Sequence, residues 1–241
     1  MNGIKYAEWA KHYDPQQKEL RILQQHGIDF KNKKILEVGC GTGRFTERML
    51  PLCKEIVCID PDDAALSVLR NNLNDTRITI FKGSLETIDI KKEYFDYVVF
   101  PWSMYLIADK EKNLKLAYDS LVMTGTLIIL QANSGEYESE IAHLYNKYDS
   151  LDAYTMACDK LPNCVKKVFN NVDCDTLYTY FSFNNIDEVI ENSLFFVEDE
   201  EGYLPNENAI RALRNRLSSY ITTNGKIIMS DVVSVFIARK G

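Results

Sequence analysis

The sequence has few of the features that mark membrane, metal-binding and nucleic-acid-binding proteins. No uninterrupted apolar run reaches the roughly 18 residues of a membrane-spanning helix, and the six cysteines include no Cys-x-x-Cys pair. Histidine is scarce, with three in the whole chain. Basic residues are outnumbered, because 28 lysines and arginines against 35 aspartates and glutamates give a net charge of −7. This balance disfavours binding to bulk nucleic acid or to an anionic membrane.

Internal repeats and low-complexity linkers are also absent from the sequence. The first residues, up to Trp9, carry charges where a signal peptide needs an apolar stretch, so we expect a cytoplasmic protein. In that reducing compartment the cysteines are expected to be free thiols. A metal site built from Cys158, Cys164, Cys174 and His143 is the weaker alternative, because these residues are widely spaced.

The composition indicates a globular protein with a sizeable core. Apolar residues make up 46% of the 241 positions and charged residues 26%, which excludes a disordered chain. At about 150 residues per domain, this length fits one large domain or two small ones. We expect a single domain spanning residues 1–241.

Between residues 34 and 131, strand-like and helix-like segments alternate. The expected strands are residues 34–38, 55–59, 77–81, 95–100 and 126–131. The expected helices are residues 42–50, 61–74, with Pro61 in the first turn, and 111–121. This alternation predicts βαβ units and therefore an α/β fold with a parallel sheet.

The segments on either side of this region break the alternation. Helices are expected at 3–13 and 15–26, separated because Asp14 precedes Pro15. After residue 132 we expect helices at 136–150, 186–194 and 206–221, a strand at 177–183, and final strands at 227–229 and 232–239. The predicted organisation is a helical lid (1–27), a core (about 28–132 and 226–241) and an α-rich insertion (about 133–225).

A glycine-rich turn follows the first expected strand and precedes a helix. Glycine lets the backbone turn sharply and approach a ligand closely, and the carboxyl edge of a parallel sheet is where such folds bind ligands. A dinucleotide site would need G-x-G-x-x-G. Its third glycine is replaced by Arg44 or Thr46 in the two possible registers, which argues against such a site.

Residues 37–43, E-V-G-C-G-T-G, resemble motif I of the class I S-adenosylmethionine-dependent methyltransferases, and the resemblance extends over about residues 34–132. It implies a Rossmann-like, seven-stranded, mostly parallel sheet. It also implies S-adenosylmethionine as the cofactor and S-adenosylhomocysteine as the product. Within the motif, it assigns four residues to cofactor binding: Glu37, Gly39, Gly41 and Gly43.

The family pattern implies further cofactor contacts at three other strand ends. Asp60, followed by Pro61, stands where an acidic residue accepts the ribose hydroxyls, although Asp60 could instead cap the next helix. Ser84 and Leu85 belong to the loop that holds the adenine, and Ser84 replaces an aspartate that is frequent there. The segment that begins with Pro101 and Trp102 resembles motif IV and is expected under the methionine part of the cofactor.

We expect the residues that contact the methyl acceptor to come from the lid and from the motif IV segment. The first helix resembles the lid of small-molecule members of the family, and a helix packed on the sheet edge is the alternative. We take His12, Tyr13 and Tyr105 as catalytic candidates and Tyr6 as a substrate-binding one. A surface position without a role in catalysis is the alternative for His12.

The acceptor class follows from what the motif IV segment lacks. Residues 102–105 contain no histidine, and neither an Asn/Asp-Pro-Pro-Tyr motif nor a pyrimidine-type catalytic cysteine motif is present. A carboxylate is already ionised at neutral pH and needs no base. We therefore rank carboxylate O-methylation of a small metabolite or peptide, as in natural-product biosynthesis, just ahead of N-methylation of an amine.

Three further expectations complete this hypothesis. Arg211 and Arg214 share a face of the expected helix at 206–221 and suit carboxylate recognition, unless they are solvated charges paired with Glu207. No metal is expected, because no set of ligand residues follows the fourth or fifth strand. A binding protein that keeps the cofactor without catalysis is the remaining alternative.

Overall fold

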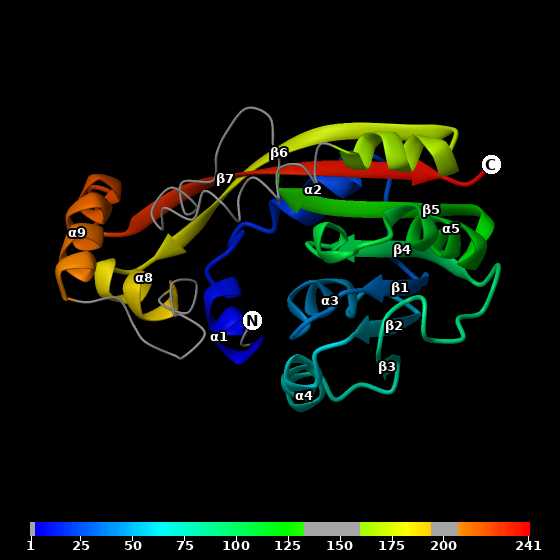
Figure 1. The fold of residues 1–241 in the computed structure, drawn as a ribbon, viewed down its shortest axis with the longest axis horizontal. Coiled ribbons are helices and arrows are strands. Elements are labelled where there is room, and N and C mark those ends of the chain that lie inside the picture. The colour runs from blue at the N-terminus through cyan, green and yellow to red at the C-terminus, as the bar shows by residue number, and fades with distance from the viewer. Residues whose placement is uncertain (1–2, 133–159, 194–206) are drawn as a thin grey trace.

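A single seven-stranded sheet organises the computed structural model, which describes residues 3–132, 160–193 and 207–241 (Figure 1). The strands are β1 (Lys34–Val38), β2 (Glu55–Asp60), β3 (Ile78–Lys82), β4 (Phe95–Pro101), β5 (Leu121–Ala132), β6 (Asn171–Phe183) and β7 (Ile227–Arg239). Their order is β3-β2-β1-β4-β5-β7-β6. The first five strands pair in parallel, whereas β7 runs antiparallel to β5 and β6. The predicted Rossmann-like, mostly parallel sheet is confirmed.

Helices cover both faces of the sheet. They are α1 (Gly3–Ala10), α2 (Lys18–Gln25), α3 (Arg44–Met49), α4 (Asp63–Asn72), α5 (Lys110–Ser120), α8 (Ile186–Ser193) and α9 (Glu207–Leu217), and residues 160–168 are helical as well. Short 3-10 turns form at η1 (Met104–Leu106) and η3 (Ser218–Tyr220). One apolar cluster joins α1, α2, α3 and α4 to the sheet through residues such as Trp9, Leu23 and Phe45, and a second joins α5 and residues 160–168 through Leu114 and Val165.

The strand order creates a crevice at the carboxyl end of β1. The chain continues from β1 to β2 on one side, while β4 lies on the other side of β1. Ile35, Leu36 and Val38 make β1 an almost continuous apolar strand, as expected for a parallel strand that is covered on both faces. In doubly wound sheets, ligands bind at such a switch point, outside the carboxyl ends of the strands.

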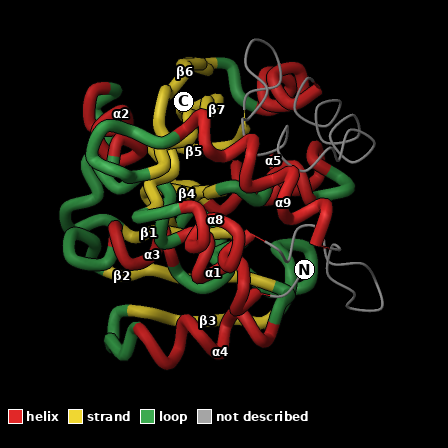
Figure 2. Tube along the Cα trace, turned by 90° about the vertical axis from the view of Figure 1, so that its left-hand side faces the viewer, coloured by secondary structure: helices red, strands yellow, loops and turns green. Residues whose placement is uncertain are grey.

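The N-terminal segment lies beyond this edge of the sheet. Helix α1 contacts α4 and α8, and Figures 1 and 2 both show it beside α8. It is shorter than the predicted helix at 3–13, because the chain turns into a β-bridge between Tyr13 and Phe181 and Asp14 takes a positive φ of 49°. The second predicted helix correspondingly begins only at Lys18.

Two further predicted boundaries are wrong. Pro61 does not lie in the first turn of α4, because Asp62 is the N-cap and accepts hydrogen bonds from the backbone N–H groups of Ala64 and Ala65. The two final strands are in fact the single strand β7, which pairs with β6 from the Asn171–Arg239 pair to the Phe183–Ile227 pair.

The predicted insertion at 133–225 includes part of the sheet. Strand β6 begins at Asn171, well before the expected strand at 177–183, and forms one edge of the sheet. The helices expected at 186–194 and 206–221 correspond to α8 and to α9 with η3. The helix expected at 136–150 lies outside the described residues. None of the helices within the described ranges is both long and apolar enough to cross a membrane.

Candidate active site

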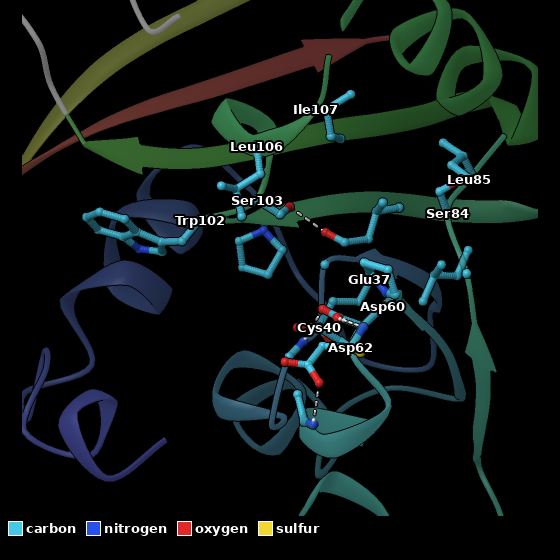
Figure 3. Close-up of a pocket in the computed structure, with 18 of the residues that line it drawn as sticks. Glu37, Cys40, Asp60, Asp62, Ser84, Leu85, Trp102, Ser103, Leu106 and Ile107 are labelled. Atoms are coloured by element: carbon cyan, nitrogen blue, oxygen red, sulfur yellow. Dashed lines mark hydrogen bonds between the residues drawn. The ribbon is translucent and has the colours of Figure 1, made fainter. Parts of the chain in front are cut away.

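A cavity of about 550 Å³ opens at the carboxyl ends of β1, β2 and β4 (Figure 3). The glycine-rich loop after β1, the end of β2 and the loop after β3 contribute to its lining. The segment after β4 also lines the cavity, and so does Tyr6 of α1. The cavity therefore lies in the crevice that the strand order creates.

The three glycines of motif I have different structural roles. All have positive φ angles of 76°, 54° and 92° at Gly39, Gly41 and Gly43. A Cβ on Gly39 would lie 2.2 Å from the Cβ of Ser103, and one on Gly43 would lie 2.4 Å from a methyl carbon of Leu69. A Cβ on Gly41, a lining residue, would meet nothing within 4 Å. Gly39 and Gly43 thus permit close packing, while Gly41 leaves space for a ligand.

Asp60 ends β2 and lines the cavity. Its Oδ2 accepts a hydrogen bond of 2.8 Å from the backbone N–H of Gly41, and its Oδ1 accepts one of 2.9 Å from the backbone N–H of Asp62. Burial raises the pKa of the Asp60 carboxyl, and this effect exceeds that of the two hydrogen bonds, which lower the pKa. Since Asp62 caps α4, the alternative role of Asp60 as the helix cap is filled by its neighbour.

Glu37 is fully buried in β1 and also lines the cavity. Its Oε2 accepts a 2.6 Å hydrogen bond from the hydroxyl of Thr46, whereas its Oε1 has no hydrogen-bond partner in the described part of the chain. Burial raises the pKa of the Glu37 carboxyl to about 7. A buried oxygen without a partner is costly. A donor group of a bound ligand would supply the missing partner.

The segment after β4 is held in a fixed conformation. Trp102 has a positive φ of 61°, and its backbone N–H donates a 2.7 Å hydrogen bond to the carbonyl of Leu130. The hydroxyl of Ser103 donates a hydrogen bond to the carbonyl of Val38 at 2.5 Å. Figure 3 draws this hydrogen bond of Ser103 as a dashed line. Pro101, Trp102 and Tyr105 of this segment line the cavity, as do Ser84 and Leu85 of the loop after β3.

The candidates on the lid divide into two groups. Tyr6 lines the cavity, and burial raises the pKa of its hydroxyl. Tyr13 and His12 are outside the lining: Tyr13 packs edge-on against Trp102 with ring centroids 5.3 Å apart. The ring of His12 stacks on Phe183 at 4.3 Å, and its Nδ1 lies 3.1 Å from the carbonyl oxygen of Ser182. His12 therefore connects the segment after α1 to β6.

The two arginines proposed for the substrate lie on α9, outside the cavity lining. Arg211 is exposed and donates a hydrogen bond to Asn208. Arg214 is exposed as well and forms an ion pair with Asp187. The structure does not bring these guanidinium groups to the cavity.

Sequence reasoning missed a cluster of four charged residues, which we call the buried charge cluster: Asp14, Glu19, Arg44 and Arg48. Both carboxylates are fully buried. Arg48 contacts Asp14 at 2.9 Å and Glu19 at 2.8 Å, and the hydroxyl of Thr179 on β6 donates to Asp14 at 2.9 Å. The cluster joins α3 to the first turn of α2 and to Asp14 in the segment before it. The available signal was the spacing of two arginines one turn apart on a short helix.

The described residues contain no group of histidine, cysteine, aspartate and glutamate side chains that could hold a metal ion.

Residues 35–125 match the family described as a methyltransferase domain. The chain is 36% identical to protein arginine N-methyltransferase 2 of Dictyostelium discoideum over 128 residues, which cover 49% of this chain and 24% of that protein. It is 24% identical to malonyl-[acyl-carrier protein] O-methyltransferase of Priestia megaterium over 146 residues, or 56% of this chain and 52% of that protein. The chain thus spans about half, or less, of the length of these curated relatives.

The fold is similar to that of phosphoethanolamine N-methyltransferase 2 of Haemonchus contortus, solved with S-adenosyl-L-methionine. The TM-score is 0.59 with 18% sequence identity, and the match covers 92% of this chain and 52% of that one. Residues 35–125 therefore match a methyltransferase domain, and the chain has a fold similar to that of a methyltransferase solved with S-adenosyl-L-methionine.

Proposed function

We propose that this protein transfers a methyl group from S-adenosylmethionine to a small-molecule acceptor. The observation that carries the proposal is the cavity, whose lining brings Glu37, Gly41 and Asp60 together. Glu37 also has a buried oxygen, Oε1, without a hydrogen-bond partner in the described part of the chain. An acidic residue suits the ribose hydroxyls, and a second one suits the ammonium group of the cofactor.

The cofactor would supply a methyl group that its sulfonium makes electrophilic. The residues of the chain bind, orient and exclude water. Asp60 would hold the ribose, and Ser84 and Leu85 the adenine. Pro101 and Trp102 would lie against the methionine part, with Tyr6 and Tyr105 nearer the acceptor. Alignment of two reactants in a closed site is the principal contribution that such an enzyme makes.

We rank a carboxylate as the methyl acceptor ahead of an amine. The described lining contains no histidine, and His12 is engaged with Ser182 and Phe183. An acceptor that is already ionised is therefore the simplest fit. The observation that favours an amine is the excess of acidic over basic side chains in the described lining. The relatives include an O-methyltransferase and N-methyltransferases, and so do not decide between the two.

Calorimetric titration with S-adenosylhomocysteine tests cofactor binding. The Asp60→Ala variant should bind more weakly by about 1.5–3 kcal/mol, the scale of hydrogen bonds to a charged group, or roughly ten- to hundredfold in Kd. Asp63→Ala removes an exposed carboxylate of α4 outside the lining and should leave the affinity unchanged. Equal affinities for wild type and Asp60→Ala would disprove the ribose contact.

Catalysis is tested separately by the formation of S-adenosylhomocysteine with carboxylic-acid and amine acceptors, including peptides. Turnover that survives treatment with EDTA is expected, because the proposed steps use no metal. Tight binding without any turnover would instead favour a protein that binds the cofactor but does not catalyse.

A further inference from the structure

Arg44 stands directly after the glycine-rich loop and lines the cavity. Among the described residues of the lining, it is the only one with a basic side chain. Its side chain is 17% exposed. Burial opposes the charge of the guanidinium, but the ion pair with Glu19 outweighs this effect and raises the pKa of Arg44, which therefore stays charged.

The charges of the lining match those of the cofactor. Four lining residues are acidic: Glu37, Asp60, Asp62 and Glu86. The amino-acid end of S-adenosylmethionine carries an ammonium and a carboxylate group, and its sulfonium adds a second positive charge. Glu37 is the partner that fits the ammonium group. In this lining, a carboxylate finds one side chain of opposite charge, which is Arg44.

The guanidinium of Arg44 is held in place before any ligand arrives. Its two terminal nitrogens donate to the two oxygens of Glu19, at 2.5 and 3.2 Å. The guanidinium carbon also lies 4.9 Å from the centre of the Tyr13 ring. A guanidinium has five N–H donors in a rigid fork, so those that Glu19 does not use remain for a second carboxylate.

Glu19 is equally constrained. It is fully buried, and its Oε1 also accepts a 2.9 Å hydrogen bond from the indole of Trp102. Arg48 donates to its other oxygen at 2.8 Å. Glu19 therefore fixes the orientation of Arg44 and connects it to the segment that closes the cavity after β4.

We propose that Arg44 binds the carboxylate at the methionine end of the cofactor, and that Glu19 is the residue that positions it. This inference rests on the proposed function, because it concerns the same cavity. It adds a charged contact at the amino-acid end to those already assigned at the ribose and the adenine. A purely structural ion pair between Arg44 and Glu19 would affect every ligand of the cavity alike, whereas a carboxylate contact distinguishes ligands that carry this group from those that lack it.

The test compares three ligands by calorimetry: S-adenosylhomocysteine, its decarboxylated analogue, and 5′-methylthioadenosine, which lacks the whole amino-acid end. Arg44→Gln should raise the Kd for S-adenosylhomocysteine at least tenfold. It should leave the Kd for the other two ligands within about twofold. Arg44→Lys keeps the charge and loses the fork, so it should weaken S-adenosylhomocysteine binding by a smaller factor.

Two further variants keep the test decisive. The double variant Arg44→Gln/Glu19→Gln replaces the ion pair by two neutral amides and avoids a buried charge without a partner. It should show the same selective loss as Arg44→Gln. Asp60→Asn is the matched control, because all three ligands keep the ribose and should weaken together. Circular dichroism reports whether each variant is folded.

Equal weakening of all three ligands by Arg44→Gln and by the double variant would overturn the inference, as would unchanged binding of S-adenosylhomocysteine. Both results would leave the proposed function intact. A wild-type protein that binds none of the three ligands would overturn the proposed function and the inference together.

Discussion

Among single residues, Glu37 shows most clearly what burial of a carboxyl group costs in stability. Its ordinary pKa of 4.5 rises to about 7 through burial. The unfolded chain therefore releases this proton at a lower pH than the folded protein. As the pH rises from about 4.5 to about 7, this residue lowers the free energy of unfolding, on the order of 3 kcal/mol for a shift of this size.

Cofactor affinity should depend on pH through the same carboxyl group. An ammonium group binds the ionised form, so the Kd for S-adenosylhomocysteine should fall as the pH rises towards 7, by up to about tenfold per unit, and level off above it. Glu37→Gln should bind more weakly and with a flatter pH profile. Calorimetry between pH 5.5 and 8.5 measures both effects.

The same variant provides its own control. Without ligand at pH 8, Glu37→Gln should be more stable to urea than the wild type by about 1–3 kcal/mol, because a neutral amide avoids the cost of burying a charge. The proposed role of Glu37 would be contradicted if ligand-free Glu37→Gln were less stable than the wild type and its binding kept the same pH profile.

Sequence reasoning located the site residues that lie in short motifs of neighbouring residues. Gly39, Gly41 and Asp60 stand in motifs that read continuously along the chain, and the cavity has all three in its lining. Glu19 and Arg44 meet through an ion pair between α2 and α3. Neither segment alone shows that its charge is buried, so the contact could not be predicted.

At the scale of elements, α4 depends on its N-cap. Asp62 accepts hydrogen bonds from the backbone N–H groups of Ala64 at 2.9 Å and Ala65 at 3.2 Å. Asp62→Ala should lower the free energy of unfolding by about 1 kcal/mol, as the loss of an N-cap typically does. Urea denaturation measures this effect.

Asp63→Ala is the neighbouring control for the cap. Its carboxylate is 59% exposed in pairs with Arg70 and Lys82, so its removal should cost less than about 0.5 kcal/mol. Equal losses for the two variants would argue against a specific role of the cap.

The buried charge cluster joins α3 to the first turn of α2 and to Asp14 in the segment before it. Arg48 donates to both carboxylates of the cluster and to the backbone carbonyl of Asp14. Arg48→Met should destabilise the protein by about 3–5 kcal/mol, because it leaves the buried carboxylate of Asp14 without a counter-charge and leaves Glu19 with Arg44 alone. Chemical denaturation, followed by tryptophan fluorescence, measures the loss.

Lys11→Met is the surface counterpart. It breaks the pair of Lys11 with Glu8, whose side chains are 63% and 54% exposed, and should change stability by less than about 0.5 kcal/mol. If Arg48→Met were as mild as Lys11→Met, the cluster would not stabilise the lid segment.

The elements that sequence reasoning predicted best are the parallel strands, because an apolar run marks a strand that is covered on both faces. The length of β6 could not be read in this way. Its first residues, from Asn171 to Asp175, are mostly exposed at the sheet edge, and they become a strand through pairing with β7. That pairing joins segments far apart in the sequence.

For the whole molecule, the parallel sheet brings the ends of three strands to one cavity. The glycine-rich loop, Asp60 and Trp102 come from β1, β2 and β4 and all line it. The alternation of strands and helices predicted this convergence. It could not predict that α9 would leave Arg211 and Arg214 outside the lining, because the helical period sets only which residues share a face.

The class of methyl acceptor is tested on the whole enzyme during turnover, through the pH dependence of its rate. A carboxylate acceptor is ionised throughout the range from pH 6.5 to 9, so turnover at saturating cofactor should be flat. An amine acceptor must lose a proton, and turnover would then rise with pH. The product gives an independent readout. A methyl ester releases methanol in mild base, and an N-methyl group does not. A flat profile with a base-labile product is the expected result, whereas a rising profile with a base-stable product would place amine N-methylation first.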